Sequence, residues 1–172
     1  FHALASDDAS PFSMAARYFL GVRHVLLKNW TSAVDQFKRL TERKTQTPAE
    51  KEIQELANLS LGRVYFEIAQ YDDAVSSYSR VAENSANFPD SLYEIAWSYV
   101  RKGSLKRATD ATDVLQLVAE DSILAPEAKI LQGTLQQKLQ QYDAAKETYN
   151  DVINTYAPDR DEIDALLSVH KD

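Results

Sequence analysis

Residues 61–81 read LGRVYFEIAQYDDAVSSYSRV, and this stretch decides the fold because three other stretches align with it without a gap. They are LGVRHVLLKNWTSAVDQFKRL at 20–40, IAWSYVRKGSLKRATDATDVL at 95–115 and QGTLQQKLQQYDAAKETYNDV at 132–152. All four stretches have an alanine at the same place, namely Ala33, Ala74, Ala108 and Ala145. The alanines are 41, 34 and 37 residues apart, and a period near these lengths is typical of arrays of helical hairpins.

Each of these alanines has companions at fixed distances. Bulky residues stand three positions before it, at Trp30, Tyr71, Leu105 and Tyr142. Four positions after it stand Phe37, Tyr78, Thr112 and Tyr149. The spacing places all three side chains on one helix face. Small residues precede the alanine by 12 positions, at Gly21, Gly62, Ala96 and Gly133, and we interpret them as places where two helices approach closely.

The pattern predicts helices near 11–27, 31–43, 48–69, 72–84, 89–101, 105–119, 125–140 and 143–156. A ninth is expected at 161–170, where Ile163, Leu166 and Leu167 form an apolar stripe. Residues 47–50, Thr-Pro-Ala-Glu, have the form of a capping box with proline in the first turn. Ser10 and Pro11 are expected to open the first helix in the same way.

A small residue followed by W/Y-x-x-A-x-x-x-F/Y resembles the tetratricopeptide repeat (TPR). The resemblance implies an all-α fold, a right-handed α-α superhelix (TPR solenoid) of about four helix-turn-helix repeats plus a C-terminal helix. The repeats are placed near 13–47, 48–88, 89–124 and 125–158, with a capping helix near 161–170, all in one domain spanning 1–172. Thr112 departs from the pattern, because the family has an aromatic residue there. His24 and Gln136 likewise stand where the other two repeats have tyrosine.

Composition argues against several functions. The net charge is −7 and no basic run occurs, which makes a nucleic-acid partner unfavourable. Cysteine is absent, so thiolate chemistry is excluded. The three histidines are far apart, and no phosphate-loop or hydrolase motif is present. The acidic groups at 72–73 and 159–164 are interpreted as helix starts. We therefore expect no enzyme activity, no metal and no cofactor.

The sequence holds no candidate membrane segment, because no apolar run approaches the ~20 residues that a membrane span needs. The chain begins with Phe1, and we expect it to be a fragment of a longer protein.

In the TPR family the first helix of each repeat lines a concave groove. The resemblance implies that nine side chains here bind a partner: Tyr18, Val22, Leu59, Arg63, Phe66, Tyr93, Trp97, Arg101 and Lys138. The same projection adds Val25, Ile130 and Thr134. Two interpretations stay open at this point. The aromatic residues form a binding groove with Arg63 and Arg101 as anchors, or they fill gaps between helices while the arginines are solvated.

A narrower resemblance concerns three segments: YEIAWSYVRKG, APEAKILQGTLQQKLQQYDAA and DRDEIDALLSVHKD. They are similar to TPR proteins of the bacterial cell envelope, including components of gliding machinery. This implies a scaffold in a periplasmic or envelope assembly such as a motility complex, with a protein or peptide as partner. The alternative is a structural module that self-associates, as a homo-oligomer, or that joins a longer helical region through its terminal repeats.

Overall fold

The computed structural model describes residues 4–5, 10–119 and 122–169. Within these residues the regular structure is helical and no strand occurs. The helices are α2 (Ser13–Leu26), α3 (Trp30–Thr41), α4 (Pro48–Glu67), α5 (Tyr71–Tyr78), α6 (Phe88–Lys102), α7 (Leu105–Val118), α8 (Ala125–Lys138) and α9 (Tyr142–Val169). The eight helices from α2 to α9 occupy the segments that the sequence predicts, so the all-α prediction is confirmed.

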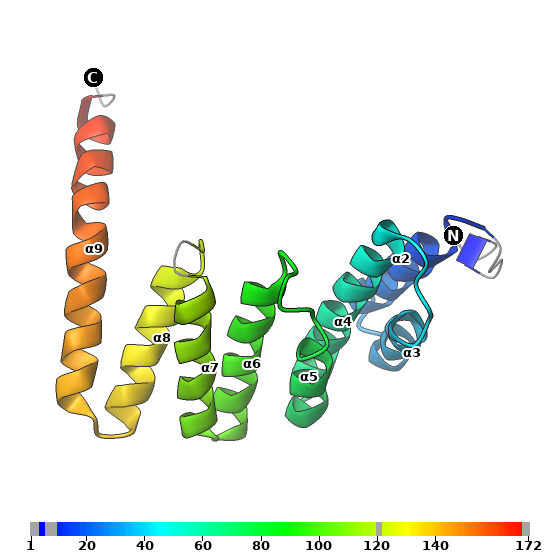
Figure 1. The fold of residues 1–172 in the computed structure, drawn as a ribbon, viewed down its shortest axis with the longest axis horizontal. Helices are drawn as coiled ribbons and strands as arrows, with labels where there is room; N and C mark the ends of the chain where they lie inside the picture. Colours follow the sequence, from blue (N-terminus) through cyan, green and yellow to red (C-terminus); the bar gives the residue numbers. More distant parts are fainter. Residues whose placement is uncertain (1–3, 6–9, 120–121, 170–172) are drawn as a thin grey trace.

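The helices form a curved row in which each one packs against the next (Figure 1). The first helices of the pairs also contact one another, because α2 touches α4 and α4 touches α6. Contacts of that extent are not found between the second helices α3, α5 and α7 in the described part of the chain. Helices on the inside of a curve lie closer together than those on the outside. The inner, concave side of the row therefore carries α2, α4 and α6, and we call this side the inner face.

The repeated alanines hold the pairs together. Ala33, Ala74 and Ala108 are completely buried, and Ala145 is nearly so. Three aromatic rings lie directly against glycines of the preceding helix, and the pairs are Gly21 with Phe37, Gly62 with Tyr78 and Gly133 with Tyr149. The close approach expected at these small residues is thus confirmed.

The turn within each hairpin has the same geometry four times. The residue five positions before the alanine has a positive φ: Lys28 at 56°, Ala69 at 60°, Gly103 at 80° and Gln140 at 62°. In each turn the residue that follows donates its backbone N–H to a carbonyl five positions back, as from Ser104 to Tyr99 at 2.9 Å. These left-handed residues end the first helix of each pair and satisfy its last carbonyls.

Helix starts agree with the sequence in one case and not in another. Thr47 accepts the Glu50 N–H while the Glu50 carboxylate accepts the Thr47 N–H, which completes the predicted capping box. The prediction for Ser10 and Pro11 is wrong, because α2 begins only at Ser13 and its N-cap, Phe12, makes no side-chain capping bond. The Ser10 hydroxyl instead accepts the N–H of Phe12 in a turn before the helix.

Two helix ends also differ from the prediction. The helix predicted at 72–84 is α5, and it ends at Tyr78 rather than near 84. The backbone then continues in turns at Arg80 and Val81. The break expected between 156 and 161 does not occur, because α9 runs unbroken from Tyr142 to Val169 with Pro158 inside it. A proline removes one helical hydrogen bond and disfavours a helix without forbidding it. The C-terminal segment is thus an extension of α9 beyond the row (Figure 1).

Candidate functional site

The inner face carries an ion pair between neighbouring repeats. Arg63 of α4 donates from Nε to Glu94 Oε1 of α6 at 2.8 Å. Glu94 also accepts a hydrogen bond from the Tyr78 hydroxyl at 3.3 Å. Sequence reasoning did not select Glu94, although a signal was available. Glu94 follows Arg63 by 31 residues, close to one repeat period, so the two belong on adjacent first helices.

The electrostatics of this group follow from its burial and its charges. Burial raises the pKa of the Tyr78 phenol, and the Glu94 carboxylate raises it further. Partial burial acts to lower the pKa of Arg63, but the hydrogen bond and charge of Glu94 outweigh it and raise that pKa. Tyr78 therefore stays a neutral donor and Arg63 stays cationic, so Glu94 is held in place from two sides.

Arg101 forms a second group at the end of α6. Its guanidinium carbon lies 5.5 Å from the centre of the Phe66 ring and 5.8 Å from the centre of the Tyr71 ring. The two rings meet edge to face, with centroids 5.6 Å apart. Such cation–π contacts order an exposed guanidinium beside apolar surface. Arg101 is thus an exposed cation held by contacts on the inner face.

Trp97 and Tyr93 stand one turn apart on α6 and contact each other edge to face, with ring centroids 6.4 Å apart. Tyr93 is half-buried against the core, whereas Trp97 keeps 37% of its surface exposed. Arg63, Phe66, Tyr93, Trp97 and Arg101 all come from the adjacent helices α4 and α6. We call these five residues the α4–α6 cluster.

The other predicted groove residues lie outside the α4–α6 cluster. The prediction that Leu59 lines the groove is wrong, because Leu59 is only 3% exposed and packs in the core with Ala74 and Tyr78. Tyr18 and Val22 are half-buried against the core of the first repeat, where the Tyr18 hydroxyl is 3.2 Å from the Ser60 hydroxyl. Lys138 is exposed in the last turn of α8.

The three further residues projected onto the groove differ in exposure and contacts. Val25 is half-buried and Ile130 is exposed. The Thr134 hydroxyl is 3.1 Å from that of Tyr149. Sequence reasoning thus selected five residues on the adjacent helices α4 and α6, where Arg101 contacts Phe66 and Tyr93 contacts Trp97, while the remaining ones lie in the first and fourth repeats or are buried.

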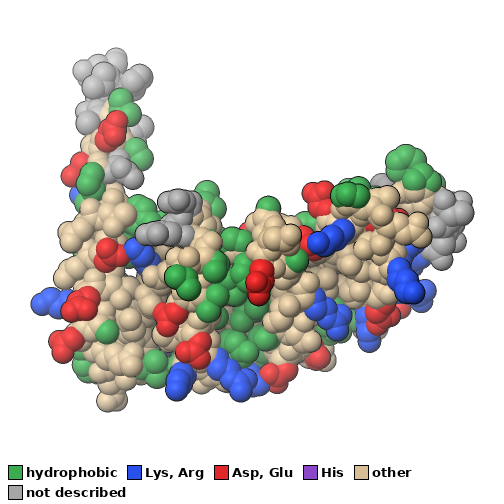
Figure 2. All heavy atoms as spheres, in the orientation of Figure 1, with side chains coloured by type: hydrophobic (Ala, Val, Ile, Leu, Met, Phe, Trp, Pro, Cys, Tyr) green, Lys and Arg blue, Asp and Glu red, His purple; other side chains and the backbone are tan. Residues whose placement is uncertain are grey.

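Hydrophobic side chains gather over the middle of the row, with charged side chains of both signs around them (Figure 2). In α2 and the residue before it, three exposed apolar residues recur every seven positions, at Phe12, Phe19 and Leu26.

Among the described residues, no group of His, Asp and Glu side chains is arranged to hold a metal ion. In the same part of the chain, no helix has the length and apolar character that a bilayer crossing requires.

Comparisons with solved structures agree with this architecture. TPR-like repeats of a Podosopora anserina protein assigned as a kinesin light chain, in a glutamine-to-methionine variant, superpose with a TM-score of 0.71 at 15% identity, over 92% of this chain and 82% of that one. The same repeats without that change give 0.70 at 15% identity, over 91% and 81%. The apo form of RapI gives 0.73 at 11% identity, over 93% and 62%. No curated protein matches the chain.

Two family models, both described as tetratricopeptide repeat, match residues 59–121 and 127–158, which together make up more than half of the chain. The hairpin of α2 and α3 precedes these segments and repeats their glycine–aromatic contact. With the curved row of helical hairpins, these matches show that the chain belongs to the tetratricopeptide repeat family.

Proposed function

We propose that the chain is a non-enzymatic scaffold whose inner face binds a peptide or helix of a partner protein. Tetratricopeptide repeats support a role in protein–protein interaction. The observation that carries the proposal is the α4–α6 cluster, in which the exposed Trp97 lies one helical turn before Arg101 on α6, and Arg63 and Phe66 come from the adjacent helix α4. Tryptophan, tyrosine and arginine are the residue types that most often dominate binding energy at interfaces.

The cluster suits a partner with both apolar and acidic groups. Trp97 and the rim of Phe66 offer aromatic surface, and Arg101 offers a cation that its ring contacts hold in position. Arg63 is already paired with Glu94, so a partner carboxylate would share it. An extended or helical segment that places an apolar side chain near a carboxylate would use all of these groups.

We further propose that this scaffold acts in a bacterial envelope or periplasmic assembly, such as a motility complex. The support is the resemblance of residues 93–103, 125–145 and 159–172 to envelope proteins of that kind. A fusion protein that reports export to the periplasm tests the location, and retention of the full-length protein in the cytoplasm would contradict it.

The binding test uses two inner-face variants, Trp97→Ala and Arg63→Glu. Both should reduce the amount of partner protein captured from an extract of the source organism, while circular dichroism shows unchanged helicity. Arg39→Glu is the matched control, because Arg39 also pairs with a carboxylate, Asp35, but lies on the second helix α3. Equal capture by wild type and both inner-face variants would remove the inner face from the proposal.

A second function is favoured by the end of the row. Tyr142 on α9 is 64% exposed, and Ile153 and Ile163 on the same helix are also exposed. Apolar groups on a terminal helix suit stacking against a further repeat or a second copy. Light scattering over a range of concentrations distinguishes the two functions, because self-association raises the mass with concentration and a pure binding module stays monomeric.

A further inference from the structure

The last two repeats hold two hollows that meet at one residue, where the second helices α7 and α9 flank α8. The first, about 570 Å³, is lined by Ser122, Ile123, Pro126, Lys129, Asp151, Thr155 and Tyr156. The second, about 350 Å³, is lined by Asp113, Gln116, Leu117, Ala125 and Lys129. Since both include Lys129, α8 forms the floor between walls from α7 and α9. We call the two hollows together the outer groove.

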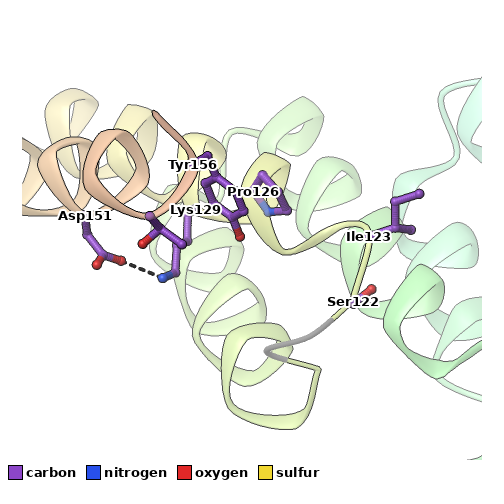
Figure 3. A pocket seen from close by; sticks show the side chains of 7 residues that line it. Ser122, Ile123, Pro126, Lys129, Asp151 and Tyr156 are labelled. Atoms are coloured by element: carbon purple, nitrogen blue, oxygen red, sulfur yellow. Dashed lines mark hydrogen bonds and ion pairs between the residues drawn. The ribbon is translucent and has the colours of Figure 1, made fainter. Parts of the chain in front are cut away.

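Polar bonds hold the floor and walls of the outer groove together. The Gln132 side chain donates to Asp113 at 2.5 Å and accepts from Gln116 at 2.8 Å, which joins α8 to α7. Lys129 donates to Asp151 at 2.5 Å, which joins α8 to α9 (Figure 3). The outer groove is therefore built by contacts of α8 with both α7 and α9.

The rim of the outer groove is apolar and exposed. Leu117 is 85% exposed and Ile123 is 89% exposed, and the two border the adjoining hollows. Pro126 and Tyr156 add apolar surface within the first hollow (Figure 3). Single exposed apolar residues are ordinary, but apolar residues that converge on one concave surface indicate a contact site.

The distribution of charged side chains indicates which kind of partner the outer groove suits. Residues 105–169 carry twelve acidic and six basic side chains, whereas residues 1–104 carry thirteen and twelve. The excess negative charge of the chain thus lies in its C-terminal part, which includes the three helices around the outer groove. Two exposed carboxylates line the outer groove, those of Asp113 and Asp151, whereas the lining residue Lys129 keeps only 21% of its side chain exposed and is bound to Asp151. A cationic segment would be attracted to this surface.

From this geometry we propose that the outer groove binds a basic amphipathic segment of a partner protein. Apolar side chains of that segment enter the two hollows beside Leu117 and Ile123, and its lysines or arginines face the surrounding carboxylates. This site is separate from the inner face, so one scaffold molecule binds two different partner segments at once.

The experiment uses fluorescence anisotropy with a labelled 14-residue peptide of leucine and lysine in helical spacing, and a second peptide with glutamate in place of lysine. The groove variant is Leu117→Ser with Ile123→Ser. The matched control is Phe12→Ser with Leu26→Ser, which removes two exposed apolar residues, one directly before α2 and one at its last position. Trp97→Ala reports on the inner face.

The proposal expects the leucine–lysine peptide to bind the wild type, with a Kd raised about tenfold or more by the groove variant. The α2 control and Trp97→Ala should leave that Kd unchanged, and the leucine–glutamate peptide should bind much more weakly. An unchanged Kd in the groove variant, an equal loss in the α2 control, or equal binding of both peptides overturns it. Loss of binding with Trp97→Ala alone would place the peptide on the inner face and also overturn it.

Discussion

The ring of Phe37 occupies the space that a side chain on Gly21 would need. A Cβ atom at Gly21 would lie 2.5 Å from Cε1 of Phe37, and one at Gly133 would lie 2.6 Å from Cε1 of Tyr149. Carbon atoms that are not bonded to each other do not approach so closely. The distance between the two helices of a hairpin is therefore set by the absence of a side chain on the first and a ring on the second.

The first prediction concerns this contact. Gly21→Ala should destabilise the protein by about 1–3 kcal/mol, because the added methyl group must displace a fully buried ring. Urea denaturation measures the change. Phe37→Leu provides the control, since a smaller side chain should lower the cost of Gly21→Ala in the double variant. Additive effects of the two substitutions would mean that the ring is not the cause.

In the third repeat the contact between the two helices of the hairpin is made by different residues. Ala96 stands where the others have glycine, Thr112 stands where they have a ring, and both are completely buried. We predict that Thr112→Tyr alone destabilises the protein, because the ring meets the Ala96 methyl group. Adding Ala96→Gly should restore part of the loss, with a coupling of about 1 kcal/mol or more. Thermal unfolding of the four proteins of the cycle measures it, and no coupling would contradict the pairing.

The fold could be predicted because its determinants repeat. Ala33, Ala74, Ala108 and Ala145 mark one position four times, and each is buried as expected. The features that could not be predicted from the sequence occur at single positions and do not repeat. The continuation of α9 through Pro158 depends on a small balance between a lost hydrogen bond and the helix formers around it.

The candidate site was predicted only in part, for a related reason. The position of each residue in the TPR pattern led to the prediction of Arg63, Trp97 and Arg101 on the inner face. The same reasoning projected Leu59 of the second repeat onto that face, but Leu59 is in the core. Position along a helix does not decide burial, because the neighbouring helix determines which side chains it covers. The partner of Arg63, Glu94, belongs to another repeat, and only the packing of α4 on α6 brings the two together.

The hairpin turns give a third prediction. Lys28, Ala69 and Gln140 have left-handed backbone conformations that are unfavourable for residues with a Cβ atom. Replacing any one of them by glycine should raise stability, by about 1 kcal/mol at most. Gly103→Ala should do the opposite, and since nothing lies within 4 Å of a Cβ there, its cost is one of backbone conformation alone. Differential scanning calorimetry measures the shifts in Tm, and a lower Tm in all three glycine variants would refute the interpretation.

The capping box of α4 gives the last prediction, which concerns pH. Hydrogen bonds from the backbone of Gln46 and then of Thr47 hold the pKa of Glu50 below its ordinary value of 4.5. Burial opposes this shift, and the charge of Arg43 adds to it to a lesser extent. A carboxyl whose pKa is lower in the folded state stabilises the protein above the unfolded pKa and loses that effect as the pH falls through the folded one. Glu50→Gln retains the shape of the box and removes the charge, so it should be less stable than wild type at pH 7, and the difference should shrink as the pH falls through the folded pKa toward about pH 2. Urea denaturation at both values checks this, with Thr47→Ala as control because it removes the hydroxyl acceptor and should cost about 1 kcal/mol at pH 7. A Glu50→Gln difference that is the same at both pH values would show that the carboxylate charge does not contribute to the cap.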